Sequence, residues 1–316
     1  MNARVRFGCA LAAAVALLVP ASAAPLRAQT ALVTLKIATT PLDVGAEAFF
    51  ALGEGFFRDA GIDAQVQAID NGSAVASGVA SGALDIGQSN IVSLATAHDK
   101  KIPFVIIAPA ARYSDATPTT VIVALKNSPL KTAKDLVGKT TTTNGILNIG
   151  QIATMAWLEK NGADPKTVKF LELPVASQPA ALESGRIDVA LLAEPVLSEE
   201  LASGKVRLFA KPYSALGTGW LIGAYFTTDA WAKAHPDLVR KFASVMEQTA
   251  KWANAHQAES AKILEQYTKI HLGPQVARAV YAERLIPRDI QPVIDASARY
   301  GAISAPFPAA DLLFQP

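Results

Sequence analysis

The stretch Ser81-Gly82-Ala83-Leu84-Asp85-Ile86-Gly87 occurs a second time as Ser184-Gly185-Arg186-Ile187-Asp188-Val189-Ala190. Gly185 follows Gly82 by 103 residues, and the same offset joins Lys36–Thr40 to Lys139–Thr143. Two similar pairs of segments at one spacing indicate that the chain contains a duplicated unit.

Each copy of this stretch marks the same local structure. An alanine-rich helix is expected to end at Ser-Gly, because glycine tolerates the left-handed conformation that closes a helix. A short apolar strand follows at once, over Leu84–Gly87 in the first copy and Ile187–Leu192 in the second. Ligands of open parallel sheets bind at the carboxyl ends of the strands. The sequence therefore predicts two α/β lobes that offer their strand ends to a shared ligand.

The first 28 residues have the pattern of a secretory signal. Arg4 and Arg6 precede the apolar stretch Phe7–Val19, which is too short to span a bilayer. Small residues suited to signal cleavage end at Ala23 and at Ala28, and we favour cleavage after Ala28. The alternative is an uncleaved anchor. A cleaved signal predicts that the mature protein is exported across the inner membrane.

Composition argues against several classes of function. The single cysteine, Cys9, lies in the signal, so the mature chain would have no thiol for a disulfide, a metal site or nucleophilic catalysis. The four histidines are far apart and match no metal-ligand spacing, so we expect no cofactor. Loss of the signal removes three of the 29 basic residues, so 26 basic residues remain beside 27 acidic ones. This near-neutral balance argues against nucleic acid as a partner.

The order of predicted elements suggests how the chain divides. Strand and helix patterns alternate from Leu35 to Ala111, as is typical of a mainly parallel sheet. A break at Thr117–Thr120 precedes a first crossover, after which the alternation repeats. Leu221–Thr227 would return the chain to the first lobe.

We therefore expect an α/β protein with two lobes, each a mainly parallel sheet flanked by helices. Amphipathic spacing in the C-terminal part predicts a helical tail that packs on lobe one. The expected divisions are a signal peptide over 1–28, lobe one over 29–117 plus 221–316, and lobe two over 118–220.

Six motifs follow one another along nearly the whole mature chain: Lys36–Ala38, Gly55–Ile62, Ser81–Gly87, Lys134–Lys139, Glu183–Val189 and Glu194-Pro195. In this order they resemble the periplasmic substrate-binding proteins of ABC importers, and most of all those of the nitrate/sulfonate/taurine and thiamine-pyrimidine type. The resemblance implies a type II periplasmic binding protein fold whose lobes close about a hinge, with no catalysis. It also implies a monomer that carries a small-molecule ligand to a membrane permease.

One residue departs from the pattern of that family. Many relatives have an aromatic residue just before Glu-Pro, whereas this chain has Ala193. A ring that would stack on a ligand is missing there, so the ligand of any one relative does not transfer to this chain.

Candidate ligand-binding residues of lobe one follow its predicted strands. Their hydroxyls, amides and helix-start N–H groups suit an anion, because the helix dipole favours negative charge there. The structural alternative for each group is ordinary helix capping or a turn. The candidates are Thr39, Thr40, Pro41 and Leu42 after the first strand, Asn71 and Ser73 in the next turn, and Gln88, Ser89 and Asn90 past the repeated strand, with Ser89 favoured.

Candidates in lobe two lie at equivalent places. Asn144, Gly145 and Ile146 match the segment just after the first strand by the 103-residue offset and open a long helix, so their N–H groups would hold an anion through dipoles. Ser177 is a further candidate. Glu194 would suit an amine, amidine or hydroxyl, and its alternative role is a hinge-side ion pair. If Glu194 faces the ligand, a purely anionic ligand is disfavoured, because like charges repel.

Four candidates lie near the crossovers. Arg112 could clamp a carboxylate or sulfonate, next to Tyr113, and its alternative is a surface pair with Asp115. Trp220 and Tyr225 flank the return crossover, where their rings could stack on a planar ligand or simply fill the core.

The leading hypothesis is a solute-binding protein that delivers a small organic anion, a carboxylate or sulfonate with or without a ring, to an ABC permease. A pyrimidine or thiamine-precursor binder of the same fold and a secreted ligand sensor are the alternatives. An enzyme like the thiamine-pyrimidine synthase of related fold would need clustered Cys and His, and the mature chain has no Cys.

Overall fold

A computed structural model describes Met1, residues 32–69 and residues 72–315. The expected signal, apart from Met1, and the candidate Asn71 lie outside these residues. Residues 32–316 form one compact unit. Within the described part, no helix combines the length and the apolar character that a membrane span needs.

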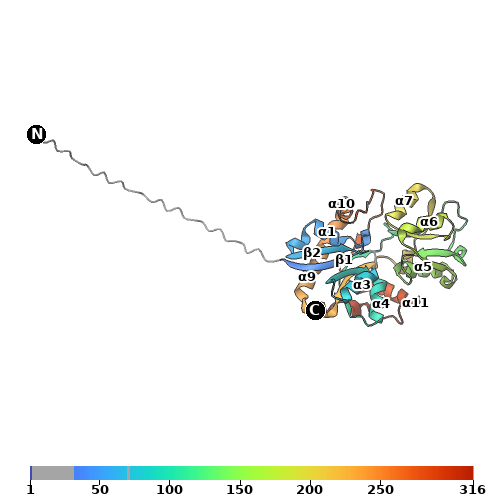
Figure 1. Ribbon diagram of the computed structural model, residues 1–316. Helices are drawn as coiled ribbons and strands as arrows, with labels where there is room; N and C mark the ends of the chain where they lie inside the picture. Colours follow the sequence, from blue (N-terminus) through green and yellow to red (C-terminus); the bar gives the residue numbers. More distant parts are fainter. Residues whose placement is uncertain (2–31, 70–71, 316) are drawn as a thin grey trace. The chain divides into compact units, whose positions relative to one another are not determined.

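The first sheet has five strands in the order β2-β1-β3-β11-β4. Strand β1 lies between β2 and β3 and pairs in parallel with both, whereas β11 lies antiparallel between β3 and β4. A strand from the later part of the chain thus lies between two strands from its first part (Figure 1). The strands are β1 (Val33–Thr39), β2 (Ile62–Ala68), β3 (Ile86–Asn90), β4 (Phe104–Pro109) and β11 (Gly223–Thr228).

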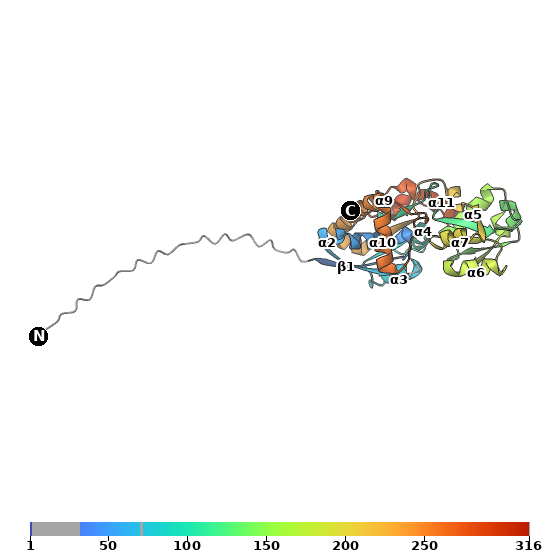
Figure 2. The ribbon, with the colours of Figure 1, turned by 90° about the horizontal axis from the view of Figure 1, so that it is seen from above.

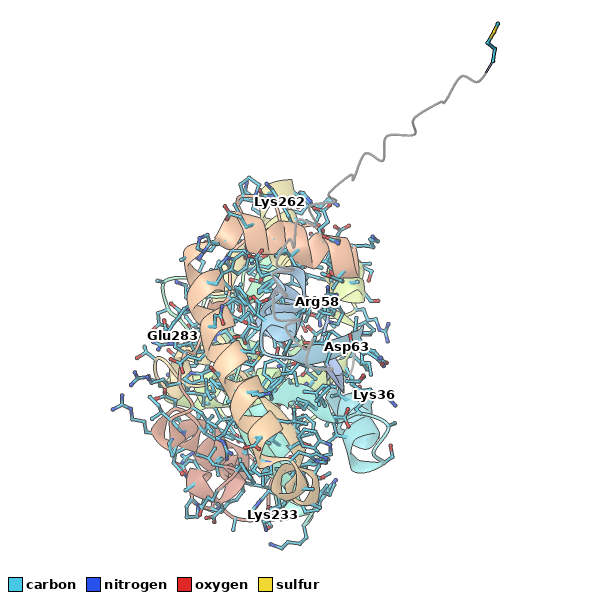
Figure 3. The ribbon with its side chains drawn as sticks, turned by 90° about the vertical axis from the view of Figure 1, so that its left-hand side faces the viewer. Lys36, Arg58, Asp63, Lys233, Lys262 and Glu283 are labelled. Atoms are coloured by element: carbon cyan, nitrogen blue, oxygen red, sulfur yellow. The ribbon has the colours of Figure 1, made fainter. Side chains whose placement is uncertain are left out.

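Helices from both ends of the chain accompany this sheet. They are α1 (Glu47–Gly53), α2 (Phe56–Asp59), α3 (Gly72–Ala80), α4 (Ile91–Asp99), α8 (Asp229–Ala234), α9 (Pro236–Ala255), α10 (Gln257–Thr268) and α11 (Gln291–Arg299). The apolar side of α9 buries Phe242, Val245 and Met246 in a cluster with side chains of β1 and β4. Figure 3 looks onto α9 and α10, with Lys262 marking α10 and Lys233 marking α8.

Two helical stretches are each divided in two. Gly55 adopts a left-handed conformation with φ of 78° between α1 and α2. The second break lies at His235-Pro236, between α8 and α9, since proline cannot donate the backbone hydrogen bond that would continue α8.

Residues 120–210 form a second set of strands. β6 (Thr120–Leu125) lies between β9 (Ala190–Ala193) and β10 (Val206–Ala210), antiparallel to both. β7 (Thr140–Thr143) and β8 (Lys169–Glu172) form a separate parallel pair. The prediction of a mainly parallel sheet is therefore wrong for the three-stranded sheet, because the pairs that hold it together run in opposite directions.

Three helices belong with these strands: α5 (Ile149–Lys160), α6 (Gln178–Glu183) and α7 (Val196–Ser203). Figures 1 and 2 both show them gathered away from α9 and α10. The small antiparallel pair β5 (Ala111–Arg112) and β12 (Val280–Tyr281) completes the strands. Short 3-10 helices lie at Asp43–Gly45, Ala133–Leu136, Pro165–Thr167, Val175–Ser177, Pro212–Leu216, Pro287–Asp289 and Ala309–Leu312.

The repeated stretch has the same hydrogen bonds in both copies. Gly82 and Gly185 are left-handed, with φ of 75° and 73°. Asp85 accepts the backbone N–H of Lys36 at 2.8 Å and donates its own N–H to the Lys36 carbonyl at 2.9 Å. Asp188 does the same with Thr140, also at 2.8 and 2.9 Å. The partner of the second copy is thus one residue further along than the 103-residue offset predicts.

Candidate functional site

A cavity of about 840 Å³ lies between the start of α3, the side of α4 and the loop that precedes α5. Five of the candidates line it, namely Ser73, Asn90, Asn144, Gly145 and Ile146. They come from both sets of strands, so two segments far apart in the sequence share one cavity. The other lining residues are Gly72, Ala76, Ser77, Ala80, Ser93, Thr96, Ala97, Lys100, Ile102, Phe104, Leu147, Asn148, Glu172 and Ala302.

An unusual buried hydroxyl, that of Ser89 in β3, lies beside the start of α3. Ser89 is 1% exposed, and its Oγ has no hydrogen-bond partner among the described residues. This Oγ lies 2.6 Å from the position that a Cβ on Gly72 would occupy, so only glycine fits there without a shift. A buried hydroxyl that has no partner among the described residues suits an oxygen atom of a ligand.

The strand of the first repeat is longer than predicted. Gln88, Ser89 and Asn90 belong to β3 and do not follow it, because pairing with the distant strand β11 extends β3 to Asn90. Asn90 caps α4, with its side chain accepting the N–H of Ser93 at 3.0 Å, as the capping interpretation predicts.

The residues at the end of β1 are tied to one another. Thr39 is buried and donates to the Gly45 carbonyl at 2.5 Å, and Thr40 donates to the Gln88 side chain at 3.3 Å. Pro41 and Leu42 are half-buried. None of these four candidates lines the cavity.

The loop before α5 keeps its own N–H groups occupied. The N–H of Ile146 donates to Glu172 Oε2 at 3.2 Å, and that of Leu147 donates to Gln151 Oε1 at 2.8 Å. Asn148 caps the helix by accepting the N–H of Ile149 at 2.5 Å. This loop is therefore a poor anion site as it stands. It lies beside the carboxylate of Glu172 at the end of β8, a residue that no motif in the sequence singles out. Ser177 is exposed and lies outside the cavity lining.

Arg112, Tyr113 and Trp220 meet near the crossovers. Tyr113 and Trp220 are buried and stacked, with ring centroids 5.5 Å apart. The Tyr113 hydroxyl donates to Asp115 at 2.8 Å, which replaces the expected pairing of Asp115 with Arg112, and burial raises the pKa of Tyr113 above its ordinary value. Arg112 is exposed beside Gly219 and forms no ion pair among the described residues. The two rings serve as core.

Tyr225 is a core residue as well. It is fully buried, and its hydroxyl accepts the backbone N–H of Ala48 at 3.0 Å. Nearby Glu47 is also fully buried, and within the described part of the chain neither carboxylate oxygen has a hydrogen-bond partner. Burial raises the pKa of Glu47 well above its usual value, which favours the protonated acid. No motif in the sequence singles out Glu47, because the burial of one carboxyl group depends on tertiary packing.

Glu194 faces neutral donors. It is 6% exposed and accepts the Ser198 N–H and hydroxyl at 3.1 and 2.9 Å and the Ala277 N–H at 3.2 Å. Burial raises the pKa of Glu194, while these hydrogen bonds oppose the shift. The structure thus places Glu194 against α7 and the C-terminal segment, apart from the cavity lining.

A buried ion pair supports this region. Asp43 accepts Arg278 Nε at 3.0 Å and Arg278 Nη2 at 2.8 Å, and it also accepts the backbone N–H of Ala279 at 2.7 Å. Both side chains of the pair are at most 8% exposed. The sequence contained no local signal for this pair, because the partners are more than two hundred residues apart.

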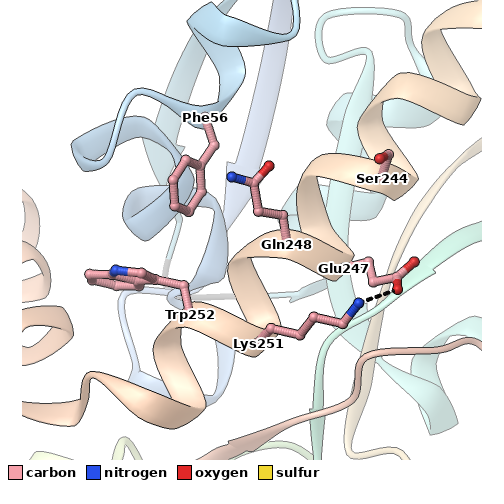
Figure 4. A pocket seen from close by; sticks show the side chains of 6 residues that line it. All are labelled: Phe56, Ser244, Glu247, Gln248, Lys251 and Trp252. Carbon is pink, nitrogen blue, oxygen red and sulfur yellow. Dashed lines mark hydrogen bonds and ion pairs between the residues drawn. The ribbon is translucent and has the colours of Figure 1, made fainter.

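A second hollow, of about 560 Å³, lies on the outer side of α9. Figure 4 shows Phe56 and Trp252 at one end and the pair of Glu247 and Lys251, joined at 2.6 Å, at the other. Gln248 and Ser244 complete its lining. It shares no residue with the cavity described above and brings none of the candidates together. Among the described residues, no group of acidic, histidine or cysteine side chains could hold a metal ion.

Comparisons with solved structures concern the fold. The chain is similar to the periplasmic aliphatic sulphonate binding protein of Escherichia coli, with a TM-score of 0.75 and 15% identity over 90% of this chain and 92% of that one. It is also similar to the nitrate-binding protein of Synechocystis PCC 6803, with a TM-score of 0.71 and 14% identity over 88% and 84% of the two chains. The chain therefore has the periplasmic binding protein fold.

The sequence comparisons point the same way. The taurine-binding periplasmic protein of Escherichia coli is 23% identical over 188 residues, which are 60% of this chain. The match spans 57% of the length of that relative. A family model described as NMT1/THI5 like matches residues 46–260. All the residues named above as lining the cavity lie in this range, except Ala302.

Proposed function

Because this chain belongs to the NMT1/THI5-like family, we propose that it is an extracytoplasmic solute-binding protein. Its ligand is a small organic anion, a carboxylate or a sulfonate, which it delivers to an ABC-transporter permease. The taurine-binding and sulphonate-binding relatives support the class of ligand, and their fold supports the mode of binding.

The observation that carries this proposal is the cavity lined by both sets of strands. Its volume of about 840 Å³ lies within the usual range for small-molecule sites, which is about 300–1,000 Å³. Its lining combines apolar side chains such as Phe104 with hydroxyls such as Ser73 and Ser93. This mixture of apolar surface and a few convergent polar groups is typical of ligand sites.

The anionic group of the ligand binds on the side of α3 and α4. Lys100, which directly follows α4, supplies a positive charge there. The Ser89 hydroxyl, which has no hydrogen-bond partner among the described residues, lies beside Gly72 at the start of α3. In the loop before α5, the N–H groups of Ile146 and Leu147 are already bonded.

The remaining parts of the proposal concern maturation and motion. Residues 1–28 act as the export signal, and the mature protein works in the periplasm. The chain closes about a hinge between lobe one, over 29–117 and 221–316, and lobe two, over 118–220. The N-terminal residue of protein recovered from the periplasm, measured by mass spectrometry, tests the cleavage after Ala28.

Thermal-shift screening tests the ligand class. The wild-type protein is screened against organic sulfonates and carboxylates, with pyrimidines, thiamine precursors and organic cations in parallel. A true ligand at about 100 times its Kd should stabilise the protein by about 2.7 kcal/mol. We expect hits among the anions, and hits confined to cations or pyrimidines would overturn the proposed ligand class.

A further inference from the structure

Two charged residues line the cavity within the described chain, and they have opposite signs. Lys100 follows the last turn of α4, on the side of the five-stranded sheet. Glu172 ends β8, beside the loop that precedes α5. The electrostatic potential in the cavity therefore changes from one wall to the other, and a ligand that spans the cavity meets both signs.

The carboxylate of Glu172 is held in place at the second wall. Its Oε2 accepts the N–H of Ile146 at 3.2 Å, while no hydrogen bond to its Oε1 is found among the described residues. The residue is exposed, so this second oxygen is available to a ligand in the cavity. A fixed acceptor with one free oxygen suits an ammonium or another hydrogen-bond donor.

The same carboxylate opposes a second anionic group. An anion placed at the loop before α5 would lie near Glu172, and like charges repel more strongly in a cavity of reduced dielectric than in water. It would also find the N–H groups of Ile146 and Leu147 already occupied. The cavity lining also includes the apolar side chains of Ala76, Ala97 and Ile102, which suit an aliphatic part of a ligand.

We infer that Glu172 is the specificity-determining residue of this site. It selects ligands that carry an anionic group at one end and a cationic or hydrogen-donating group at the other, and it rejects ligands with two anionic ends. This inference rests on the proposed function, because it assigns the charge pattern of the ligand to the same cavity. Selection thus uses a repulsive contact as well as an attractive one.

Three compounds with one spacer test the inference: propane-1-sulfonate, 3-aminopropane-1-sulfonate and propane-1,3-disulfonate. Calorimetric titration of the wild type should rank the amino compound first and the disulfonate last, with at least a tenfold difference in Kd between them. Glu172→Gln keeps an oxygen for the Ile146 N–H but removes the charge, so the difference should shrink to about threefold or less. The charge-reversing Glu172→Lys should favour the disulfonate.

Glu199→Gln provides the matched control, because Glu199 is an exposed glutamate on α7 that lies outside the cavity lining. It should keep the wild-type ranking. If the wild type binds at least one compound but Glu172→Gln leaves the Kd ratios unchanged, the inference alone is overturned. If neither these compounds nor any other organic anion binds the wild type, both the proposed function and the inference that rests on it are overturned.

Discussion

The Asp85 carboxylate accepts a hydrogen bond from the backbone N–H of Lys36 at 2.8 Å, and the backbone N–H of Asp85 donates to the Lys36 carbonyl at 2.9 Å. The same pair of bonds joins Asp188 to Thr140. The first copy thus ties the start of β3 to β1, and the second copy ties the segment before β9 to β7. The recurring aspartate therefore has a structural role, which is to join two segments of the fold by hydrogen bonds, and this role does not depend on a ligand.

Loss of the Asp85 carboxylate should therefore reduce stability. Asp85→Ala leaves the Lys36 N–H without its charged acceptor, and we expect a loss of about 1–3 kcal/mol in the free energy of unfolding. Asp188→Ala should behave alike. Urea unfolding measures the loss, and Asp59→Ala, at an exposed aspartate of α2, is the control. An unchanged midpoint for Asp85→Ala would contradict this role.

Ser89 separates stability from binding. Its buried Oγ has no partner among the described residues, so Ser89→Ala should leave the unliganded protein equally stable or slightly more stable. If a ligand oxygen is the missing partner, the same variant should lose about fivefold in affinity, or roughly 1 kcal/mol. Thermal unfolding with and without ligand measures both effects. A loss of stability without a loss of affinity would show that the hydroxyl is purely structural.

Lys100 should contribute to anion binding. Lys100→Gln removes the positive charge at the α4 wall, and because Lys100 is exposed the expected loss of affinity is about two- to fivefold. The loss should become smaller as salt screens the interaction. Lys101→Gln is the matched control, since the neighbouring lysine is exposed and lies outside the cavity lining. Equal effects of the two variants would remove Lys100 from the site.

Glu47 should make stability depend on pH. Burial raises its pKa, so the folded protein keeps this carboxyl protonated at pH values where the unfolded chain has released the proton. The stability is thus full below the ordinary carboxyl pKa of about 4.3, and it falls as the pH rises toward the folded-state pKa. Glu47→Gln should be more stable than the wild type at pH 7.

Urea unfolding between pH 4 and pH 8 measures this effect, and the advantage of Glu47→Gln should disappear near pH 4. Glu54→Gln, at an exposed glutamate just after α1, is the control and should follow the wild type. Parallel stability curves for the wild type and Glu47→Gln would contradict the burial of an unpartnered acid.

The pair of Asp43 and Arg278 should be among the more costly contacts to break. Arg278→Leu leaves Asp43 buried without its charged partner, for which we expect a loss of about 3–5 kcal/mol. The double variant with Asp43→Asn should recover part of that loss. Arg240→Leu breaks an exposed pair with Asp237 and should cost less than about 1 kcal/mol. Equal costs for the two arginines would contradict the prediction.

The sequence alone predicted the features that depend on neighbouring residues. The repeat placed Gly82 and Gly185 at helix ends, where both are left-handed, and the N-cap role of Asn90 follows from its own side chain. Alternating patterns predicted the α/β class, and the order of motifs led to the family that the comparisons confirm. These features are local, because periodicity and capping act over a few residues.

Only the tertiary structure decided which of these residues meet. β3 reaches Asn90 because β11 pairs with it from more than a hundred residues away, and Ser89 is thereby buried behind Gly72. Glu172 accepts a hydrogen bond from the N–H of Ile146, 26 residues earlier in the chain. The loop before α5, whose sequence suits an anion, therefore already binds a carboxylate of the protein itself. Pairing, burial and the competition for a backbone donor depend on long-range packing, which the pattern along one segment does not determine.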